Sequence, residues 1–212
     1  IILPKAWDVV RDTLVLMALA GQQYMTQYFV CDFQDAFYKM PLHSGERKYF
    51  TIVYRGRIYI WKRLGQGSLN GPSTFGRLAA FVGRISQSLV DVKEARLQIY
   101  MDDPIAAMNA SEERVNEIVS MWLLLWMLLG FGLATHKAQL GHTVSWIGYQ
   151  FTARANEVEV QIKQSFLDEL LAETKSILSK NLVGLRTLRS YTGKSNHISN
   201  LLFAWRPFMD TL

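Results

Sequence analysis

The chain has 212 residues, of which half are hydrophobic and 19% are charged, and its 23 lysines and arginines exceed its 18 aspartates and glutamates to give a formal net charge of +5. This length can bury one sizeable core or two small subdomains, and the excess of base favours a polyanionic partner. The one cysteine, Cys31, excludes an internal disulfide and suits a reducing compartment, and no histidine is spaced from it in a way that indicates a zinc site.

The first part of the chain predicts a helix, a strand and a hairpin. Apolar positions at helical spacing predict the helix over residues 7–20, and an apolar run that ends near Asp32 predicts the strand over residues 28–33. A turn or short helix follows and ends at Pro41, because proline does not fit a helix interior. Two runs of β-branched and aromatic residues predict a hairpin over residues 49–61.

The second part of the chain predicts more helix than strand. From Pro72 onward apolar residues recur at helical spacing, and the proline is well placed for a first helical turn. Short apolar runs on both sides of two aspartates predict a hairpin over residues 96–108. Near the end of the chain, the pattern predicts strands over residues 144–151 and 157–162. Two helices, over about 163–179 and about 183–203, close the chain.

One uncharged stretch, residues 118–134, only just reaches the length of a membrane-spanning helix. It is interrupted by a serine and two glycines, and the polar lead-in that starts at Ser111 is typical of a capped helix start. We therefore predict a buried helix packed under a sheet, followed by a glycine-rich stop. A transmembrane span is the alternative interpretation.

Two adjacent aspartates carry the clearest chemical signal. Tyr100-Met101-Asp102-Asp103 lies between two apolar runs, so a tight hairpin would present both acids at its bend. Adjacent aspartates repel each other, and neither has a basic neighbour in the sequence. A divalent cation would neutralise the pair, and hard oxygen ligands suit Mg²⁺. The plainer interpretation is an acidic turn on the surface.

A third carboxylate, Asp32, favours the metal interpretation. It closes an apolar run 70 residues before Asp102, so only a folded sheet could bring the two together. Three convergent carboxylates can hold two metal ions roughly 3.5–4 Å apart, which is the arrangement used for phosphoryl displacement. One ion would activate a 3′-hydroxyl, and both would stabilise charge on the α-phosphate and the leaving pyrophosphate.

Six motifs follow one another along the chain. They are Cys31-Asp32-Phe33-Gln34-Asp35-Ala36-Phe37, Leu64-Gly65-Gln66-Gly67 with Gly71-Pro72-Ser73-Thr74-Phe75, Tyr100-Met101-Asp102-Asp103, Gly132-Leu133-Ala134-Thr135-His136-Lys137, Trp146-Ile147-Gly148-Tyr149 and a helix over residues 185–196. In this order they resemble the palm motifs, primer grip and thumb helix of the reverse transcriptases of retroviruses and retrotransposons. Gly65 departs from the family pattern, in which proline is frequent.

The resemblance implies a fold and an activity. The fold would be an α+β right-hand polymerase palm, an antiparallel sheet backed by helices, with partial fingers and thumb. The palm and the second fingers segment would occupy residues 1–151, and the fingers hairpin within them would span 42–63. A thumb-like helical region would occupy residues 152–212. The activity would be that of an RNA-directed DNA polymerase (reverse transcriptase), which transfers dNTPs onto a primer 3′-end with two Mg²⁺ ions, or Mn²⁺ in their place.

The resemblance also implies roles for the acidic residues and for one lysine. Asp32, Asp102 and Asp103 would bind the two metal ions, and the backbone carbonyl of Phe33 would complete one coordination shell. Lys137 would donate a proton to the pyrophosphate leaving group, which needs a mobile ammonium. Without the family likeness, Lys137 is an ordinary solvated lysine.

Nucleotide and nucleic-acid contacts follow from the same likeness. The backbone amides of Asp35 and Ala36 would meet the triphosphate, and Phe37 would lie under the sugar, where a 2′-hydroxyl would clash. Gln66 and Gly67 would contact the incoming base pair. The implied primer and template residues are Tyr100, Met101, Arg77, Arg84, Trp146, Ile147, Gly148, Arg186, Arg189 and Lys194. Core aromatics and solvated charges are the plainer interpretations of several of these.

Three alternatives stay open. An RNA-templated RNA polymerase would share the carboxylates, although Phe37 and the Met101 form of the hairpin argue against it. A non-catalytic, polymerase-derived nucleic-acid-binding protein is disfavoured because all three aspartates are present. The third is a membrane protein built on residues 118–134.

The expected context is a larger viral or transposon protein. The chain begins at Ile1 without an initiator methionine, so we expect a segment of a retroelement polyprotein. An RNase H is a candidate neighbour, and the first fingers segment would lie upstream. Pro104 and the thumb pattern look closer to retrotransposons than to retroviruses. We expect an intracellular location, cytoplasmic or nuclear, and no membrane partner.

Overall fold

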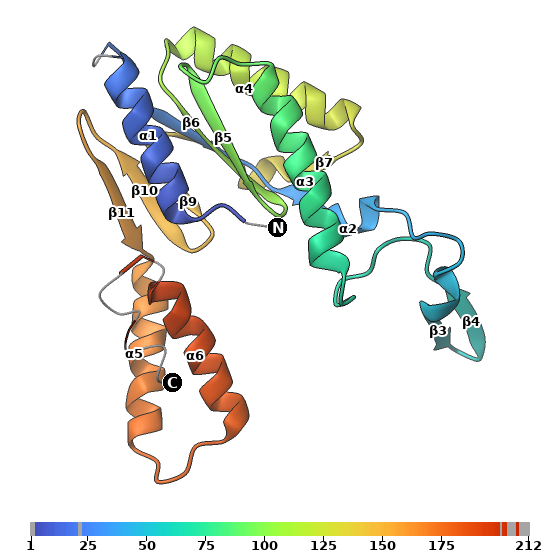
Figure 1. Cartoon of the computed structure of the whole chain (residues 1–212). Coiled ribbons are helices and arrows are strands. Elements are labelled where there is room, and N and C mark those ends of the chain that lie inside the picture. Colours follow the sequence, from blue (N-terminus) through green and yellow to red (C-terminus); the bar gives the residue numbers. More distant parts are fainter. Residues whose placement is uncertain (1–2, 21–22, 200, 203–206, 208–212) are drawn as a thin grey trace.

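The computed structural model describes residues 3–20, 23–199, 201–202 and 207 (Figure 1). Its helices and strands are α1 (Ala6–Ala20), β1 (Gln27–Val30), β2 (Phe33–Gln34), α2 (Ala36–Lys39), β3 (Thr51–Tyr54), β4 (Arg57–Ile60), α3 (Gly71–Ser88), β5 (Ala95–Tyr100), β6 (Asp103–Met108), α4 (Glu112–Leu128), β7 (Gly132–Leu133), β8 (Gln139–Gly141), β9 (Thr143–Trp146), β10 (Tyr149–Ala153), β11 (Val158–Ile162), α5 (Gln164–Leu178) and α6 (Leu185–Ser199). Helices with antiparallel sheets confirm the predicted α+β class.

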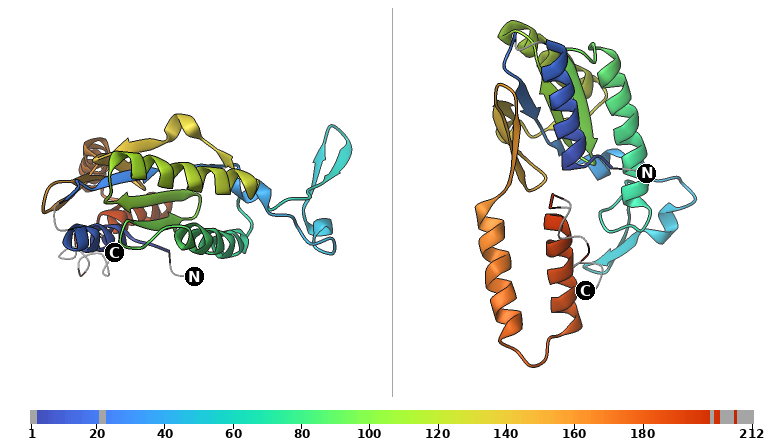
Figure 2. Two further views of the ribbon diagram at one scale, coloured as in Figure 1. Left: turned by 90° about the horizontal axis from the view of Figure 1, so that it is seen from above. Right: turned by 60° about the vertical axis from the view of Figure 1, so that its left-hand side comes forward.

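A four-stranded antiparallel sheet, in the order β5-β6-β1-β8, forms the centre of the palm. Alternate side chains of a strand face opposite sides of a sheet, so β1 divides its apolar residues between two cores. Phe29 and Ala106 face α3 and α4, whereas Tyr28, Val30 and Ile105 face α1 and the β9–β10 hairpin. Both faces are thus covered, and Figure 2 shows helices on both sides of the sheet.

Helix α4 is the buried helix that we predicted for the uncharged stretch. Its N-cap Ser111 accepts a hydrogen bond from the backbone of Arg114, as the sequence predicts. Trp122 and Trp126 are fully buried, but Leu128 is 77% exposed, so the helix is apolar on its solvent side as well. It ends before Gly130, which has a positive φ of 84°. No helix within the described part of the chain is long and apolar enough to cross a membrane.

The predicted single strand over residues 144–151 is wrong, because the structure forms a hairpin there. Strands β9 and β10 join through Ile147 and Gly148, whose φ angles are +39° and +87°. A two-residue hairpin turn with positive φ at both positions matches the twist of the flanking strands. Isoleucine is rare in that conformation, so the residue type at position 147 did not predict a turn. Strand β11 completes this second antiparallel sheet.

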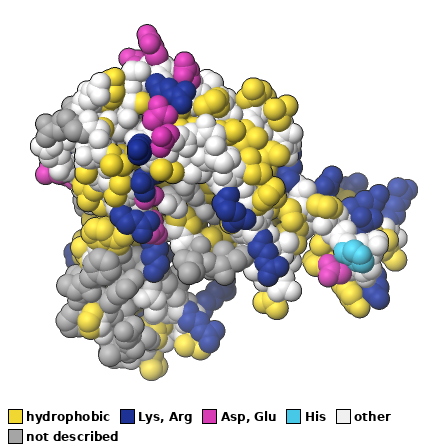
Figure 3. Space-filling view, turned by 45° about the horizontal axis from the view of Figure 1, so that its top comes forward, with side chains coloured by type: hydrophobic (Ala, Val, Ile, Leu, Met, Phe, Trp, Pro, Cys, Tyr) yellow, Lys and Arg dark blue, Asp and Glu magenta, His cyan; other side chains and the backbone are white. Residues whose placement is uncertain are grey.

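Two parts project from the palm. The β3–β4 hairpin extends to one side, and the α5–α6 pair extends from the end of β11 (Figure 1). Side chains of the hairpin are exposed on both faces, and hydrophobic and basic groups are mixed on this lobe (Figure 3). The predicted 151/152 boundary falls inside β10, and the helical region begins only at Gln164. Residues 200 and 203 of the predicted last helix lie outside the described residues.

Candidate active site

Strand pairing brings the three predicted carboxylates to one end of the palm sheet. Asp102 lies in the turn between β5 and β6, where Met101 adopts a φ of +54° and Tyr100 pairs with Asp103. The backbone N–H of Phe33 donates to the carbonyl of Asp102 at 2.9 Å. The register of β1 and β6, extended by two residues, therefore sets Asp32 opposite Asp103.

Lys137 completes this group from a short turn at Thr135–Lys137. The backbone N–H of Ala134 donates to the carbonyl of Asp32 at 3.0 Å, which holds the turn beside the end of β1. The Lys137 ammonium donates a hydrogen bond to Asp32, and this bond raises the pKa of Lys137. A cavity of about 130 Å³ is lined by Asp32, Asp103 and Lys137, among others.

The carboxylates carry more negative charge than the lysine compensates. Burial is the main cause that raises the pKa of Asp102, and the charge of Asp32 adds to it. Burial, followed by the charges of Asp102 and Asp32, raises the pKa of Asp103 to about 6. Lys137 opposes both shifts to a lesser degree. A further positive charge would be stabilised at this position.

The carboxylates supply hard oxygen donors, which suit Mg²⁺. Within the ranges that the structure describes, no three His, Cys, Asp or Glu side chains are gathered closely enough to hold a metal ion. Asp32 instead holds the Lys137 ammonium. The sequence did not predict this ion pair, because its partners are 105 residues apart.

The predicted nucleotide-binding residues lie on two neighbouring elements and a loop. Phe37 on α2 stacks on Phe75 of α3 with ring centres 5.0 Å apart, and a Cβ at Gly71 would lie 3.6 Å from the Phe37 ring. Asp35 precedes α2 with a φ of +53°, and Ala36 is buried. Gln66 and Gly67 are exposed in the loop before α3.

The predicted primer-grip motif contacts the β5–β6 hairpin directly. The Trp146 side chain is 2% exposed, and its indole N–H donates to the carbonyl of Asp103 at 2.9 Å. Its ring also meets Tyr100 edge-on, with ring centres 6.3 Å apart. The Trp146 side chain is thus engaged within the protein, and its contact with a primer stays a prediction. Ile147 and Gly148 form the turn itself, where Gly148 is exposed.

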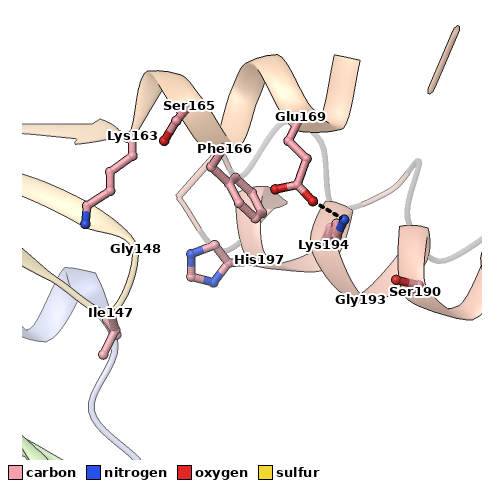
Figure 4. Close-up of a pocket in the computed structure, with 10 residues that line it drawn as sticks. All are labelled: Ile147, Gly148, Lys163, Ser165, Phe166, Glu169, Ser190, Gly193, Lys194 and His197. Atoms are coloured by element: carbon pink, nitrogen blue, oxygen red, sulfur yellow. Dashed lines mark hydrogen bonds and ion pairs between the residues drawn. The ribbon is translucent and has the colours of Figure 1, made fainter. Parts of the chain in front are cut away.

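The predicted basic contacts differ in their surroundings. Four arginines are exposed and make no ion pair with a described residue, namely Arg77, Arg84, Arg186 and Arg189. Lys194 instead donates to Glu169 at 2.6 Å (Figure 4). It also donates to Glu173 at 3.0 Å, and so ties α6 to α5. These two ion pairs compete with the phosphate contact that we expected for Lys194, and that contact stays a prediction.

The junction between the β9–β10 turn and the helices of the thumb-like region was missed by sequence reasoning. The hydroxyl of Tyr149 donates to the carbonyl of His197 at 2.6 Å, and the two rings stack with centres 4.6 Å apart. A Cβ at Gly148 would lie only 2.7 Å from the His197 ring. A cavity of about 710 Å³ opens beside this contact, between the turn and the helices (Figure 4). The glycine in the turn was the available signal for such a close approach.

Known proteins share this sequence pattern. A family model described as reverse transcriptase (RNA-dependent DNA polymerase) matches residues 9–151. The Gag-Pol polyprotein of Walleye dermal sarcoma virus is 28% identical over 148 residues, which are 68% of this chain and 7% of that polyprotein. The Pol polyprotein of Caprine arthritis encephalitis virus (strain Cork) is 26% identical over 150 residues, which are 68% of this chain and 13% of the polyprotein. Because these relatives are viral, they give no support to the expected closeness to retrotransposons.

Solved structures share the fold. A foamy viral protease-reverse transcriptase in complex with dsDNA has a TM-score of 0.58 and 20% identity, over 80% of this chain and 32% of that chain. The same kind of protein in complex with an RNA/DNA hybrid has a TM-score of 0.56 and 16% identity, over 92% of this chain and 26% of that chain. The chain thus spans less than a third of either relative. Reverse transcriptases depend on metal ions, and on the matched residues this chain belongs to the reverse transcriptase family.

Proposed function

We propose that the chain is the polymerase portion of a reverse transcriptase and adds deoxynucleotides to a primer 3′-end on an RNA or DNA template. The observation that carries the proposal is the meeting of Asp32, Asp102 and Asp103 at one end of the palm sheet. Asp32 lies 70 residues before Asp102 in the sequence, and only the sheet register brings it to the two adjacent aspartates. An acidic surface turn would not recruit a third carboxylate from another strand.

The donor set fits divalent metal ions in its chemistry, and Asp32 would leave Lys137 to join the other two carboxylates. Asp32, Asp102 and Asp103, with the backbone carbonyl of Phe33, would hold two Mg²⁺ ions, or Mn²⁺ in their place. The raised pKa values of Asp102 and Asp103 support this, because burial first, and then the charge of neighbouring carboxylates, disfavours their negative charge, which a bound cation would stabilise. Bound ions would supply an activated primer hydroxyl and charge stabilisation at the phosphates.

Lys137 would act as the proton donor to pyrophosphate. It must first leave Asp32, and its side chain, which is 59% exposed, has the freedom to do so. Its raised pKa keeps the ammonium protonated while it is paired with Asp32. A lysine that is charged before the reaction and freed when Asp32 takes another partner is suited to general-acid catalysis.

The nucleotide would lie between α2, the loop before α3 and the catalytic hairpin. The Asp35 and Ala36 backbone amides would contact the triphosphate, and Gln66 and Gly67 the base pair. The stacked Phe37 ring would exclude a 2′-hydroxyl. The ring stacks on Phe75, and Gly71 lies beside it.

Primer and template would lie across the exposed arginines and the β9–β10 turn. The expected contacts are Tyr100, Met101, Ile147, Gly148, Arg77, Arg84, Arg186 and Arg189. We propose that the part of the chain before α5 forms the palm with the second fingers segment and that the helical region from Gln164 onward forms the thumb. Both would belong to a larger viral polyprotein that also contains an RNase H. An intracellular location is supported by the free, buried thiol of Cys31.

Primer extension tests the proposal. The full chain, with a labelled primer on RNA or DNA template, is given Mg²⁺ and either dNTPs or NTPs. Extension with dNTPs on the RNA template is expected. Extension with NTPs alone would favour an RNA polymerase, and binding of primer–template without any extension would favour a non-catalytic nucleic-acid-binding protein.

A further inference from the structure

The Gln139 side chain joins two sheets of the palm. Gln139 lies on β8, at the edge of the central sheet, and pairs with Val30. Its amide N–H donates to the carbonyl of Ser145 on β9 at 3.0 Å, and its amide oxygen accepts from the N–H of Ser145 at 2.8 Å. An antiparallel strand would make the same pair of bonds to Ser145. The side chain therefore takes the place of a strand at the open edge of β9.

The residue after Ser145 continues this connection to the catalytic end. Trp146 is buried and donates to the carbonyl of Asp103 on β6, at 2.9 Å. Because β6 pairs with β1 and β1 pairs with β8, these contacts close a ring around the cavity of about 130 Å³. Asp32, Asp103 and Ile147 all line that cavity. The β9–β10 turn is therefore held beside the carboxylates by two contacts, Gln139 with Ser145 and Trp146 with Asp103.

We propose that Gln139 is a positioning residue for nucleotidyl transfer, and that its two hydrogen bonds to Ser145 set the place of the 147–148 turn relative to Asp32 and Asp103. The inference rests on the proposed function, in which this turn contacts the primer. Gln139 acts through Ser145 and contacts no reacting group. Displacement of reacting groups by about 1 Å can lower a rate by about a hundredfold, so such a brace matters for catalysis.

Amide hydrogen exchange tests the two hydrogen bonds between Gln139 and Ser145 without any need for catalytic turnover. In Gln139→Met the side chain keeps its length but loses both hydrogen bonds, and we expect amide exchange at Ser145 and over residues 146–149 to rise by about tenfold or more. Gln150→Met is the matched control, because Gln150 pairs with Ser145 from β10. Strands β1 and β6 should keep their protection in both variants. Unchanged exchange at Ser145 in Gln139→Met would overturn the inference.

Steady-state kinetics on primer–template test the consequence. We expect kcat of Gln139→Met to fall by about tenfold or more, with KM for dNTP within about twofold, because the primer end is misplaced while the nucleotide contacts are intact. Gln150→Met should match the wild type. If Gln139→Met does not fold, Gln139→Asn, which is one methylene shorter, serves in its place. Faster exchange with unchanged kcat would also overturn the proposal.

The two readouts separate this inference from the proposed function. A wild-type chain that binds primer–template and never extends it would contradict the proposed function, whatever the exchange of Ser145 shows. A wild-type chain that extends primers, with a Gln139→Met variant equal to it in both readouts, would contradict the positioning role alone.

Discussion

The side chains at the catalytic end are held in an unfavourable electrostatic state. The raised pKa of Asp103, about 6, results first from burial and then from Asp102 and Asp32. One lysine, Lys137, opposes three carboxylates, and it is bonded to Asp32. Binding of further positive charge would lower the free energy of such a site, and metal-dependent nucleotidyl transfer requires such binding.

In the proposed function, Phe37 is the residue that would separate DNA synthesis from RNA synthesis. Its ring is stacked on Phe75 and should block a ribose 2′-oxygen. In Phe37→Val that space opens, and we expect ribonucleotide use to rise by about a hundredfold or more, since a clash worth about 3 kcal/mol corresponds to that factor. Single-nucleotide extension with dNTP and NTP measures it. Phe81→Val, at a ring on α3 that is 50% exposed, should leave selectivity unchanged. Equal use of both sugars by the wild type would contradict the role of Phe37.

At the scale of elements, strands with clear apolar runs were predictable and contacts between elements were not. The hairpin that presents Asp102 follows from apolar runs around two acids, and the helix α4 follows from its Ser111 cap. The β9–β10 turn was not predictable, because Ile147 adopts a backbone conformation that its own side chain disfavours. The burial of Trp146 and the charge pairs of Lys194 depend on partners distant in sequence.

Gly148 tests the contact between the turn and α6. Both Gly148 and Gly130 have positive φ, +87° and +84°, so an alanine at either should cost about 1 kcal/mol in backbone strain. A Cβ at Gly148 would also lie 2.7 Å from the His197 ring, whereas a Cβ at Gly130 meets nothing within 4 Å. Urea unfolding should therefore show a larger loss of stability for Gly148→Ala than for Gly130→Ala. Equal losses would show that the contact with His197 is absent in solution.

At the scale of the whole molecule, the palm carries two projecting parts, the β3–β4 hairpin and the α5–α6 pair, and a basic excess of +5 (Figure 1). The hairpin combines exposed apolar side chains with basic ones, as at Val53, 74% exposed, and Ile58, 72% exposed. The helical pair keeps Arg186 and Arg189 exposed while Lys194 is paired with two glutamates. Of the three residues of this pair that we expected to contact nucleic acid, the two arginines are therefore the ones whose charge is free to meet phosphate.

Salt dependence of primer–template binding tests that distribution of charge. Each phosphate contact contributes close to one unit to the slope of log K against log salt, so Arg189→Ala should lower the slope by about one unit. Lys194→Ala should leave the slope unchanged, because Glu169 and Glu173 already neutralise that ammonium. Fluorescence anisotropy at several salt concentrations gives both slopes. A lower slope for Lys194→Ala, with an unchanged slope for Arg189→Ala, would mean that Lys194 leaves its glutamates to bind nucleic acid.

The most direct test of the account is Mg²⁺-dependent primer extension by Asp102→Asn beside Asp91→Asn. Asparagine keeps the shape of aspartate but removes the charge that a metal ion needs, and Asp91 is an exposed turn residue whose side-chain oxygen accepts a hydrogen bond from the backbone of Lys93. We predict that Asp102→Asn binds primer–template like the wild type and loses extension by about a thousandfold or more, while Asp91→Asn keeps both. Near-normal extension by Asp102→Asn would contradict the claim that three carboxylates of this sheet carry the catalysis.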